Sequence, residues 1–234
     1  MEVLVAAAIH DAKNELSALG VWLSEAQREF AALSPIPSPA LERATAIATS
    51  LSGQLVELLA LYRAGEGSLR LAVEDHYLDD FLGDLMAEAE HSRPLAASGS
   101  AGAPEREEVR LQTEFSAVKE IGTWAFDAYL VKFALLDALR NAMRNARQQV
   151  RLTFLAVPGG GIRFDVEDDG PGYPESILKD GGAAEMSAHS SGLGLTFARL
   201  IAARHATPAG RHGQLTLSND AMSGSGARFS LSLP

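Results

Sequence analysis

One carboxylate and two glycines have a spacing that could bind a flat ligand carrying an amine. Asp168, Gly170 and Gly172 are spaced as D-x-G-x-G. They follow the alternating run 161–166, which predicts a strand. A carboxylate at a strand end can accept a hydrogen bond from an exocyclic amine such as that of adenine, and glycines let a flat ligand lie against the main chain. Asp-Gly and Pro-Gly are also common in turns, so an ordinary loop is the alternative for this motif alone.

A second set of polar side chains lies on one face of a helix predicted over 125–147. Asn141 and Arg144 follow Asp137 by four and seven residues, so the three share that face. Oxygen donors on this face suit Mg²⁺, which takes few protein ligands and adds nucleotide phosphates. Arg144 could neutralise a phosphate. A solvated polar face is the alternative for this helix alone.

Glycines also open a helix predicted over 194–204. Gly192 and Gly194 lie in the run S-G-L-G-L at 191–195. Backbone N–H groups at such a helix start can approach an anion. A plain N-terminal turn would explain the same residues, so this motif has weight only together with the others.

The first part of the chain predicts two long helices with heptad seams. Apolar residues recur in steps of three and four over 2–33 and again over 40–64. The Pro-rich run 34–39 separates them, with Ser38 as N-cap and Pro39 as first helical residue. A lone antiparallel hairpin leaves its apolar stripes half exposed, so we expect a homodimer with a four-helix bundle. The seam positions are Val5, Ile9, Ala12, Leu16, Leu19, Leu23, Ala26, Phe30 and Leu33, then Leu41, Ala44, Ala48, Leu51, Leu55, Leu58 and Tyr62.

The remaining chain mixes helices and strands. The glycine-rich run 65–68 marks a boundary between a first domain, 1–66, and a second, 67–234. The elements expected after it are helices over 76–90, 125–147 and 194–204, and strands over 109–115, 149–157, 161–168, 214–218 and 227–233. This order predicts an α+β sandwich, with helices on one face of a mostly antiparallel sheet.

The composition excludes several classes of protein. The 234 residues have a formal charge of −10, which argues against a nucleic-acid surface. The absence of cysteine excludes disulfides, thiolate zinc sites and thiol chemistry. The start lacks the basic region of a signal peptide, and no continuous apolar run approaches the ~20 residues of a membrane helix. We therefore expect a cytoplasmic protein without a membrane segment.

Together, the helix bearing Asn141, the two glycine motifs and the closing hairpin resemble the GHKL ATPases in order and spacing. The likeness is greatest to the catalytic domain of sensor histidine kinases and covers about residues 68–234. It implies a Bergerat-fold ATP site in which Asn141 chelates Mg²⁺ and Asp168 binds the adenine amine. Residues 175–191 would form the ATP lid, with Lys179 as a phosphate contact or else a solvated side chain. The cofactor-binding residues implied are Asp137, Asn141, Arg144, Asp168, Gly170, Gly172, Lys179, Gly192, Gly194 and Ala227.

Residues 9–16 of the first helix resemble the H-box of histidine kinases, H-[DE]-x-[KR]-x-x-L. The resemblance implies that His10 takes a phosphoryl group from ATP and passes it to an aspartate of a response-regulator receiver domain. Asp11 would bind, or accept, the proton of the other ring nitrogen. Asn14 matches a residue that orients water for receiver dephosphorylation, so phosphatase activity is also implied. Without this context, His10 would be interpreted as an ordinary surface residue.

Three features depart from the family pattern. Such kinases usually carry a second asparagine where this chain has Asp137, and the Phe-rich box before the lid is missing. Only nine residues precede His10. We therefore expect either that the chain is a fragment of a larger kinase, with its sensor domain missing here, or that the sensor is a separate protein.

Asp137 also supports an alternative function. In the DNA gyrase branch of the family, an acidic residue four before the asparagine is the base that activates water, so this chain could be a hydrolytic ATPase. Two further alternatives are a histidine phosphotransfer adaptor with a degenerate ATP domain and an anti-sigma-type serine kinase. The intact nucleotide motifs argue against the adaptor, and the His10 hairpin argues against the serine kinase.

Overall fold

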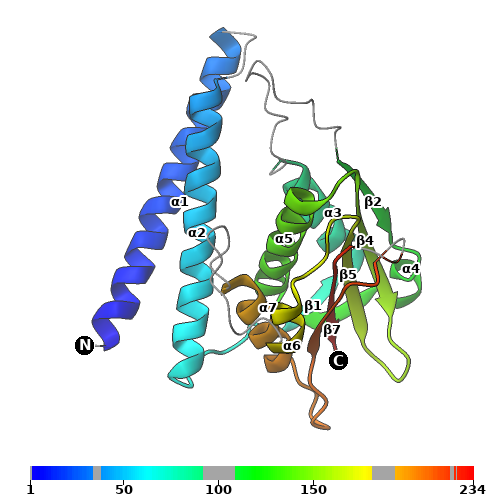
Figure 1. The fold of residues 1–234 in the computed structure, drawn as a ribbon. Helices are drawn as coiled ribbons and strands as arrows, with labels where there is room; N and C mark the ends of the chain where they lie inside the picture. The colour runs from blue at the N-terminus through cyan, green and yellow to red at the C-terminus, as the bar shows by residue number, and fades with distance from the viewer. Residues whose placement is uncertain (1, 34–37, 92–108, 181–192, 222–223, 225) are drawn as a thin grey trace. The chain divides into compact units, whose positions relative to one another are not determined.

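The computed structural model describes residues 2–33, 38–91, 109–180, 193–221, 224 and 226–234 (Figure 1). The chain forms two compact units, Met1–Arg70 and Leu71–Pro234. The first unit holds two helices, and the second holds the strands together with the other helices. The predicted α+β class, with helices first and a sheet after them, is therefore confirmed.

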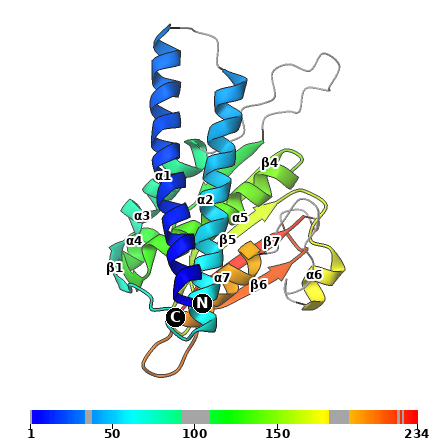
Figure 2. The same cartoon turned by 90° about the vertical axis from the view of Figure 1, so that its left-hand side faces the viewer.

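The first unit is an antiparallel helical hairpin, as predicted. α1 spans Glu2–Leu33 and α2 spans Pro39–Gly65, and the two run side by side in opposite directions (Figures 1 and 2). Pro39 lies in the first turn of α2, after an extended Ser38 whose side chain makes no capping hydrogen bond. The fixed φ of Pro39, rather than a Ser38 cap, therefore favours the start of α2.

Much of the apolar surface of this hairpin stays exposed in a single chain. The seam positions Leu19, Phe30, Leu51 and Leu58 are between 40% and 44% exposed. Trp22, next to the seam, is 67% exposed. Exposed apolar surface of this extent normally marks an interaction surface.

α2 has the composition of a possible membrane helix. Among the described helices it is the one whose length and composition would allow it to cross a bilayer. This differs from the expectation based on continuous apolar runs, because small and polar residues interrupt the run while adding little charge. Helices in the cores of soluble proteins have similar compositions, so composition alone does not assign α2 to a membrane.

A five-stranded sheet forms the centre of the second unit. Its strands are β2 (Arg110–Glu114), β4 (Gln149–Ala156), β5 (Ile162–Asp168), β6 (Gln214–Ser218) and β7 (Arg228–Leu233). They lie in the order β2-β4-β5-β7-β6. The β2–β4 pair is parallel and the other three pairs are antiparallel, which confirms the mostly antiparallel sheet.

Three helices cover one face of this sheet (Figures 1 and 2). They are α3 (Leu78–His91), α5 (Ala128–Asn145) and α7 (Leu193–Arg204). α5 contacts β4 and β5, α7 contacts β6 and β7, and α3 packs on α5. Alternation along β5 turns Ile162, Phe164 and Val166 into this core. The Phe164 ring lies 5.2 Å from Phe154 of β4 and 5.9 Å from Phe81 of α3, between ring centroids.

A small second sheet corrects two of the predicted helix starts. The elements that the sequence did not predict are β1 (Glu74–Tyr77), β3 (Thr123–Phe126), α4 (Val118–Ile121) and α6 (Glu175–Asp180). β1 and β3 pair antiparallel. The helices predicted to begin at 76 and 125 therefore begin at Leu78 and Ala128. Strand pairing between distant segments overrides the local helical pattern at both starts.

Candidate functional site

Backbone N–H groups hold the Asp168 carboxylate at the end of β5. Asp168 is 4% exposed, and its Oδ1 accepts hydrogen bonds from the N–H groups of Gly170 at 2.8 Å and Ala227 at 3.4 Å. Burial raises the pKa of Asp168, and these two donors offset part of the increase. Among the described residues no donor binds Oδ2. This oxygen is therefore the one that can accept a hydrogen bond from a ligand.

The two glycines that follow Asp168 are required by close protein neighbours. A Cβ on Gly170 would lie 2.5 Å from the carbonyl oxygen of Asn145, at the end of α5. Gly172 has a φ of +83°, and a Cβ there would lie 2.7 Å from the Asn219 side chain. The glycines thus let the loop after β5 close against α5 and against the segment after β6. These close neighbours are a second reason for glycine at both positions, besides the room for a flat ligand proposed from the sequence.

Asn219, which the sequence analysis did not identify, clamps the main chain of Tyr173. Its Oδ1 accepts a hydrogen bond from the Tyr173 N–H at 2.7 Å, and its Nδ2 donates to the Tyr173 carbonyl at 2.9 Å. Burial, with the nearby charges of Asp168 and Asp137, raises the pKa of the Tyr173 phenol. No sequence signal marks Asn219, because its partner is 46 residues away.

The predicted polar face of α5 belongs to the same unit as the end of β5. Asp137 and Asn141 are half-buried and Arg144 is exposed. Burial raises the pKa of Asp137, while Arg140 and Arg144 lower it. The side-chain oxygen of Asn141 accepts a hydrogen bond of 3.3 Å from Asn145 Nδ2. The amide oxygen of Asn141 therefore makes only a long hydrogen bond among the described residues.

Asp169 joins the end of β5 to the segment after α5. Its Oδ1 accepts hydrogen bonds from the N–H groups of Arg147 at 2.7 Å and Gln148 at 3.1 Å. Burial opposes the charge of Asp169, but the backbone donors outweigh burial and lower its pKa. Asp169 therefore helps to hold α5 against β5. The alternation of β5, which turns Asp168 inward, is the sequence signal that separates the two aspartates.

The second glycine motif and the predicted lid are described in part. Gly194 is the second residue of α7, and Gly192 lies outside the described residues. Residues 175–180 of the predicted lid form α6, and 181–191 also lie outside the described residues. Lys179 on α6 makes an exposed ion pair with Glu175 at 2.8 Å. Ala227, the other predicted cofactor residue, directly contacts Asp168 through the main chain, accepting from its N–H at 3.0 Å.

The H-box residues lie on α1, in the first unit. Asp11 and Asn14 are exposed, and the side chain of His10 lies outside the described residues. His10 and Asn14 are one helical turn apart, so their positions share a face of α1. The structure therefore supplies the helix that the H-box requires, and the role of His10 stays a prediction.

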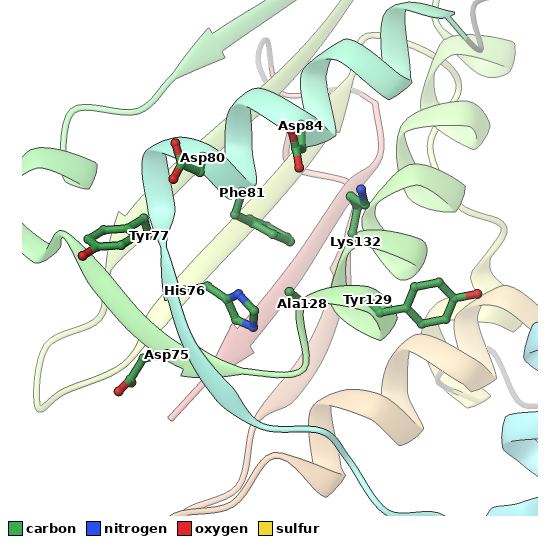
Figure 3. Close-up of a pocket in the computed structure, with 9 residues that line it drawn as sticks. All are labelled: Asp75, His76, Tyr77, Asp80, Phe81, Asp84, Ala128, Tyr129 and Lys132. Atoms are coloured by element: carbon green, nitrogen blue, oxygen red, sulfur yellow. The ribbon is translucent and has the colours of Figure 1, made fainter.

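A pocket of about 400 Å³ lies at the N-terminal ends of α3 and α5 (Figure 3). Asp75, Asp80 and Asp84 line it, and its Lys132 is paired with Glu88 at 3.3 Å. Three carboxylates in one pocket would repel the phosphates of a nucleotide. None of the predicted nucleotide-binding residues lines this pocket, so it is separate from the site at the end of β5.

Part of the second unit matches a known protein family. Residues 127–234 match the family described as histidine kinase-, DNA gyrase B-, and HSP90-like ATPase. This region is an ATPase domain of that family. The resemblance recognised from the motifs is thereby confirmed. The ATPase domain contains all the predicted nucleotide-binding residues that the structure describes, and the match leaves out the hairpin with His10.

Similarity to known sensor proteins and kinases extends beyond this ATPase domain. The chain is 32% identical to the sensor protein CseC of Streptomyces coelicolor over 174 residues, which cover 70% of this chain and 28% of CseC. Crystalline full-length ShkA in complex with AMPPNP has the same fold, with a TM-score of 0.65, 20% identity, and coverage of 100% of this chain and 46% of ShkA. The Acinetobacter baumannii histidine kinase AdeS has a TM-score of 0.57 and 16% identity, covering 92% of this chain and 94% of AdeS. The chain thus spans less than a third of CseC and less than half of ShkA.

Proposed function

We propose that this chain is the ATP-dependent core of a two-component sensor histidine kinase. The ATPase domain would bind ATP with Mg²⁺ and phosphorylate His10, and phospho-His10 would pass its phosphoryl group to a response-regulator aspartate. The observation that carries this proposal is the Asp168 carboxylate, which is buried and oriented through Oδ1, with Oδ2 left for a ligand donor. The family match supports the nucleotide, and the H-box on α1 supports the acceptor.

Each part of ATP has a candidate neighbour in the ATPase domain. Asp168 Oδ2 would accept a hydrogen bond from the adenine amine. The phosphates would lie near Gly192 and Gly194, since N–H groups at a helix start favour anions. Arg144, which is exposed, would add positive charge. Lys179 could exchange Glu175 for a phosphate, because exposed ion pairs are weak.

Asn141 fits the role of a Mg²⁺ ligand by its donor chemistry. Its amide oxygen is a hard donor, and the described hydrogen bond to that oxygen is a long one, 3.3 Å from Asn145. Mg²⁺ needs few protein ligands when nucleotide phosphates and water complete its shell. Mg²⁺ bound there would supply charge neutralisation for phosphoryl transfer.

The proposed phosphoryl transfer needs no reactant other than ATP, His10 and the receiver aspartate. A neutral ring nitrogen of His10 attacks the γ-phosphorus, the bond from that phosphorus to the β–γ bridging oxygen breaks, and ADP leaves with the electron pair. Asp11 would bind or accept the proton of the other ring nitrogen. A receiver aspartate then takes the phosphoryl group, and neutral His10 is restored.

Asn14 would orient the water that later dephosphorylates the receiver. Asn14→Ala should therefore slow receiver dephosphorylation, and an unchanged rate would reject this role.

The hairpin would pair with a second copy to form a four-helix bundle in the cytoplasm. A second hairpin would bury the half-exposed seam positions Leu19, Phe30, Leu51 and Leu58. Light scattering should therefore give twice the chain mass of 24.8 kDa. A monomer mass at micromolar concentration would contradict the dimer.

The decisive experiment is incubation with γ-³²P-ATP and Mg²⁺. We expect acid-labile label on the wild type and none on His10→Ala. His212→Ala changes an exposed histidine of the ATPase domain and should label like the wild type. Acid-stable label would indicate a serine kinase instead. Free phosphate without labelled protein would indicate hydrolysis, and no nucleotide binding would indicate an adaptor.

Asp137 favours ATP hydrolysis as a second candidate function. Burial raises its pKa, and a carboxylate with a raised pKa is a stronger base toward water. Asp137→Asn should then abolish phosphate release. Under the kinase proposal, the same change introduces the asparagine that such kinases usually carry here, so labelling of His10 should persist.

A further inference from the structure

Asp127 contacts the segment by which the chain enters the second unit from the hairpin. It is the N-cap of α5 and is 5% exposed. Its Oδ1 accepts a hydrogen bond from the Leu130 N–H at 3.0 Å, and its Oδ2 accepts one from the Ala72 N–H at 2.9 Å. One carboxylate therefore ties the linker to the helix that carries Asn141.

His205, at the end of α7, holds the main chain of Asp127. It is 3% exposed, and its Nδ1 lies 2.8 Å from the Ile201 carbonyl oxygen. A carbonyl only accepts, so Nδ1 carries the proton and Nε2 is an acceptor. Nε2 receives the Asp127 N–H at 3.0 Å. The neutral ring of His205 thus fixes Asp127 to α7, while the Asp127 carboxylate binds the linker.

The linker is anchored closely on both sides of the boundary between the two units. Before the boundary, the N–H groups of Ser68 and Leu69 donate to the Arg63 carbonyl at 2.8 and 3.0 Å. After it, Ala72 binds Asp127. Only Arg70 and Leu71 lie between these anchors, and the two units divide between them.

The anchor after the boundary depends on a hydrogen bond rather than on apolar burial. Ala72 is exposed and Val73 is 50% exposed. The next backbone pairing is that of β1, which begins with Glu74 opposite Phe126. If the Ala72 bond opens, the segment 72–73 is therefore free up to β1.

We propose that the Ala72–Asp127 hydrogen bond is a releasable latch that restrains the ATPase domain. With the latch closed, the hinge consists of Arg70 and Leu71. When the latch opens, the hinge extends through Val73 and gains two residues, or about 7 Å of reach. This inference rests on the proposed function, in which the ATPase domain must reach His10 of the hairpin. Opening the latch then speeds autophosphorylation without changing the nucleotide site.

The selective test is Asp127→Ser in the full chain. Serine is also a good N-cap, so the Leu130 bond is retained while the acceptor for Ala72 is lost. Because the lost bond has a charged acceptor, hydrogen exchange at the Ala72 amide should rise roughly tenfold to a hundredfold. Exchange at Leu130 should stay near the wild-type rate. Asp127→Asn is a second variant, and Val73→Ala is the matched control in the exposed linker.

The kinase readout separates a latch from a purely structural role. We expect Asp127→Ser to label His10 about threefold faster or more, because a longer hinge admits more orientations. ADP affinity by calorimetry should stay within about twofold of the wild type, since the altered bond lies in the linker. Val73→Ala should match the wild type in all three measurements. An unchanged or slower rate, or a loss of ADP affinity in both Asp127 variants, would overturn the proposal.

Failure of the proposed function can be recognised separately. If the wild type takes no label, the kinase proposal fails, and hydrogen exchange alone then decides the latch. Protection of the Ala72 amide that is lost in Asp127→Ser would support it. Equal exchange in the two proteins would overturn it.

Discussion

The end of β5 and the H-box face of α1 are built in opposite ways. At the end of β5, Asp168 is 4% exposed and main-chain donors orient its carboxylate. On α1, Asp11 and Asn14 are exposed, and the helix provides their spacing. Under the proposed function this difference is expected, because a site for one small ligand benefits from buried, preorganised acceptors, whereas a phosphoacceptor must be reached by large partners. Tertiary contacts therefore shape the first region, and secondary structure suffices for the second.

Asp168→Asn should have the largest effect, a loss of nucleotide affinity at the end of β5. The amide retains one oxygen for the Gly170 N–H but replaces the second acceptor with a donor, which would face the adenine amine. We expect ADP affinity measured by calorimetry to fall about a hundredfold or more, because a mismatched buried donor is left unpaired. Asn14→Ala on α1 should leave the affinity unchanged.

Asp165→Asn is the matched control for this measurement. Asp165 is 6% exposed on the same strand, but its carboxylate pairs with Arg163 on the opposite face of the sheet. ADP binding should therefore survive the change. Wild-type affinity in a folded Asp168→Asn protein would show that Asp168 does not bind the nucleotide.

Gly172→Ala should be the next largest change, and its readout is stability. Gly172 has a φ of +83°, and a Cβ there would meet Asn219. We expect the free energy of unfolding, from urea denaturation, to fall by about 2–4 kcal/mol through backbone strain and overpacking. Gly210 has a φ of +79° with nothing within 4 Å, so Gly210→Ala should lose only about 1–2 kcal/mol. Equal losses would show that Asn219 yields without cost.

His205 should make the stability of the ATPase domain depend on pH. Burial lowers the pKa of His205 below its ordinary value of 6.5, although the Ile201 carbonyl and Asp127 partly oppose this effect. As the pH falls through 6.5, the unfolded chain therefore takes up a proton before the folded chain does. The contribution of His205 to the free energy of unfolding should be greatest above this pH. As the pH falls further, the free energy of unfolding should drop by up to about 1.4 kcal/mol per pH unit until the pKa of the folded state is reached.

Urea denaturation between pH 7.5 and about 5.5 would measure this slope, which spans the unfolded pKa. His205→Gln should show a shallower slope than the wild type. His212→Gln changes an exposed histidine and serves as the control. Identical slopes in the wild type and His205→Gln would exclude His205 as the source.

Gly20→Ala is the smallest expected effect, and it has the opposite sign. Gly20 lies inside α1, and a Cβ there would have nothing within 4 Å in a single chain. Alanine should stabilise the helix by about 0.5–1 kcal/mol and raise the melting temperature without altering ADP affinity. A loss of stability would instead show that Gly20 packs against a second copy.

Local periodicity was enough to predict the main supports of the site. The heptads of 2–33 and 40–64 correctly predicted α1 and α2, and the alternation before Asp168 correctly predicted β5. Residues 125–147 predicted α5, which starts three residues later and ends two residues earlier, at Ala128 and Asn145. Heptads and alternation are readable because neighbouring residues determine which face of an element is apolar. Asp127, the true N-cap of α5, was missed because β3 continued the apolar pattern up to it.

The sequence by itself determined which residues can do chemistry: a carboxylate and glycines after a strand, an asparagine on a helix, and a histidine in an H-box. Only the tertiary structure decided how they are held. Asn219 clamps Tyr173 across 46 residues, and His205 binds Asp127 across 78. Such pairs leave no periodic trace, because each residue meets its partner only after the sheet and its helices have packed together.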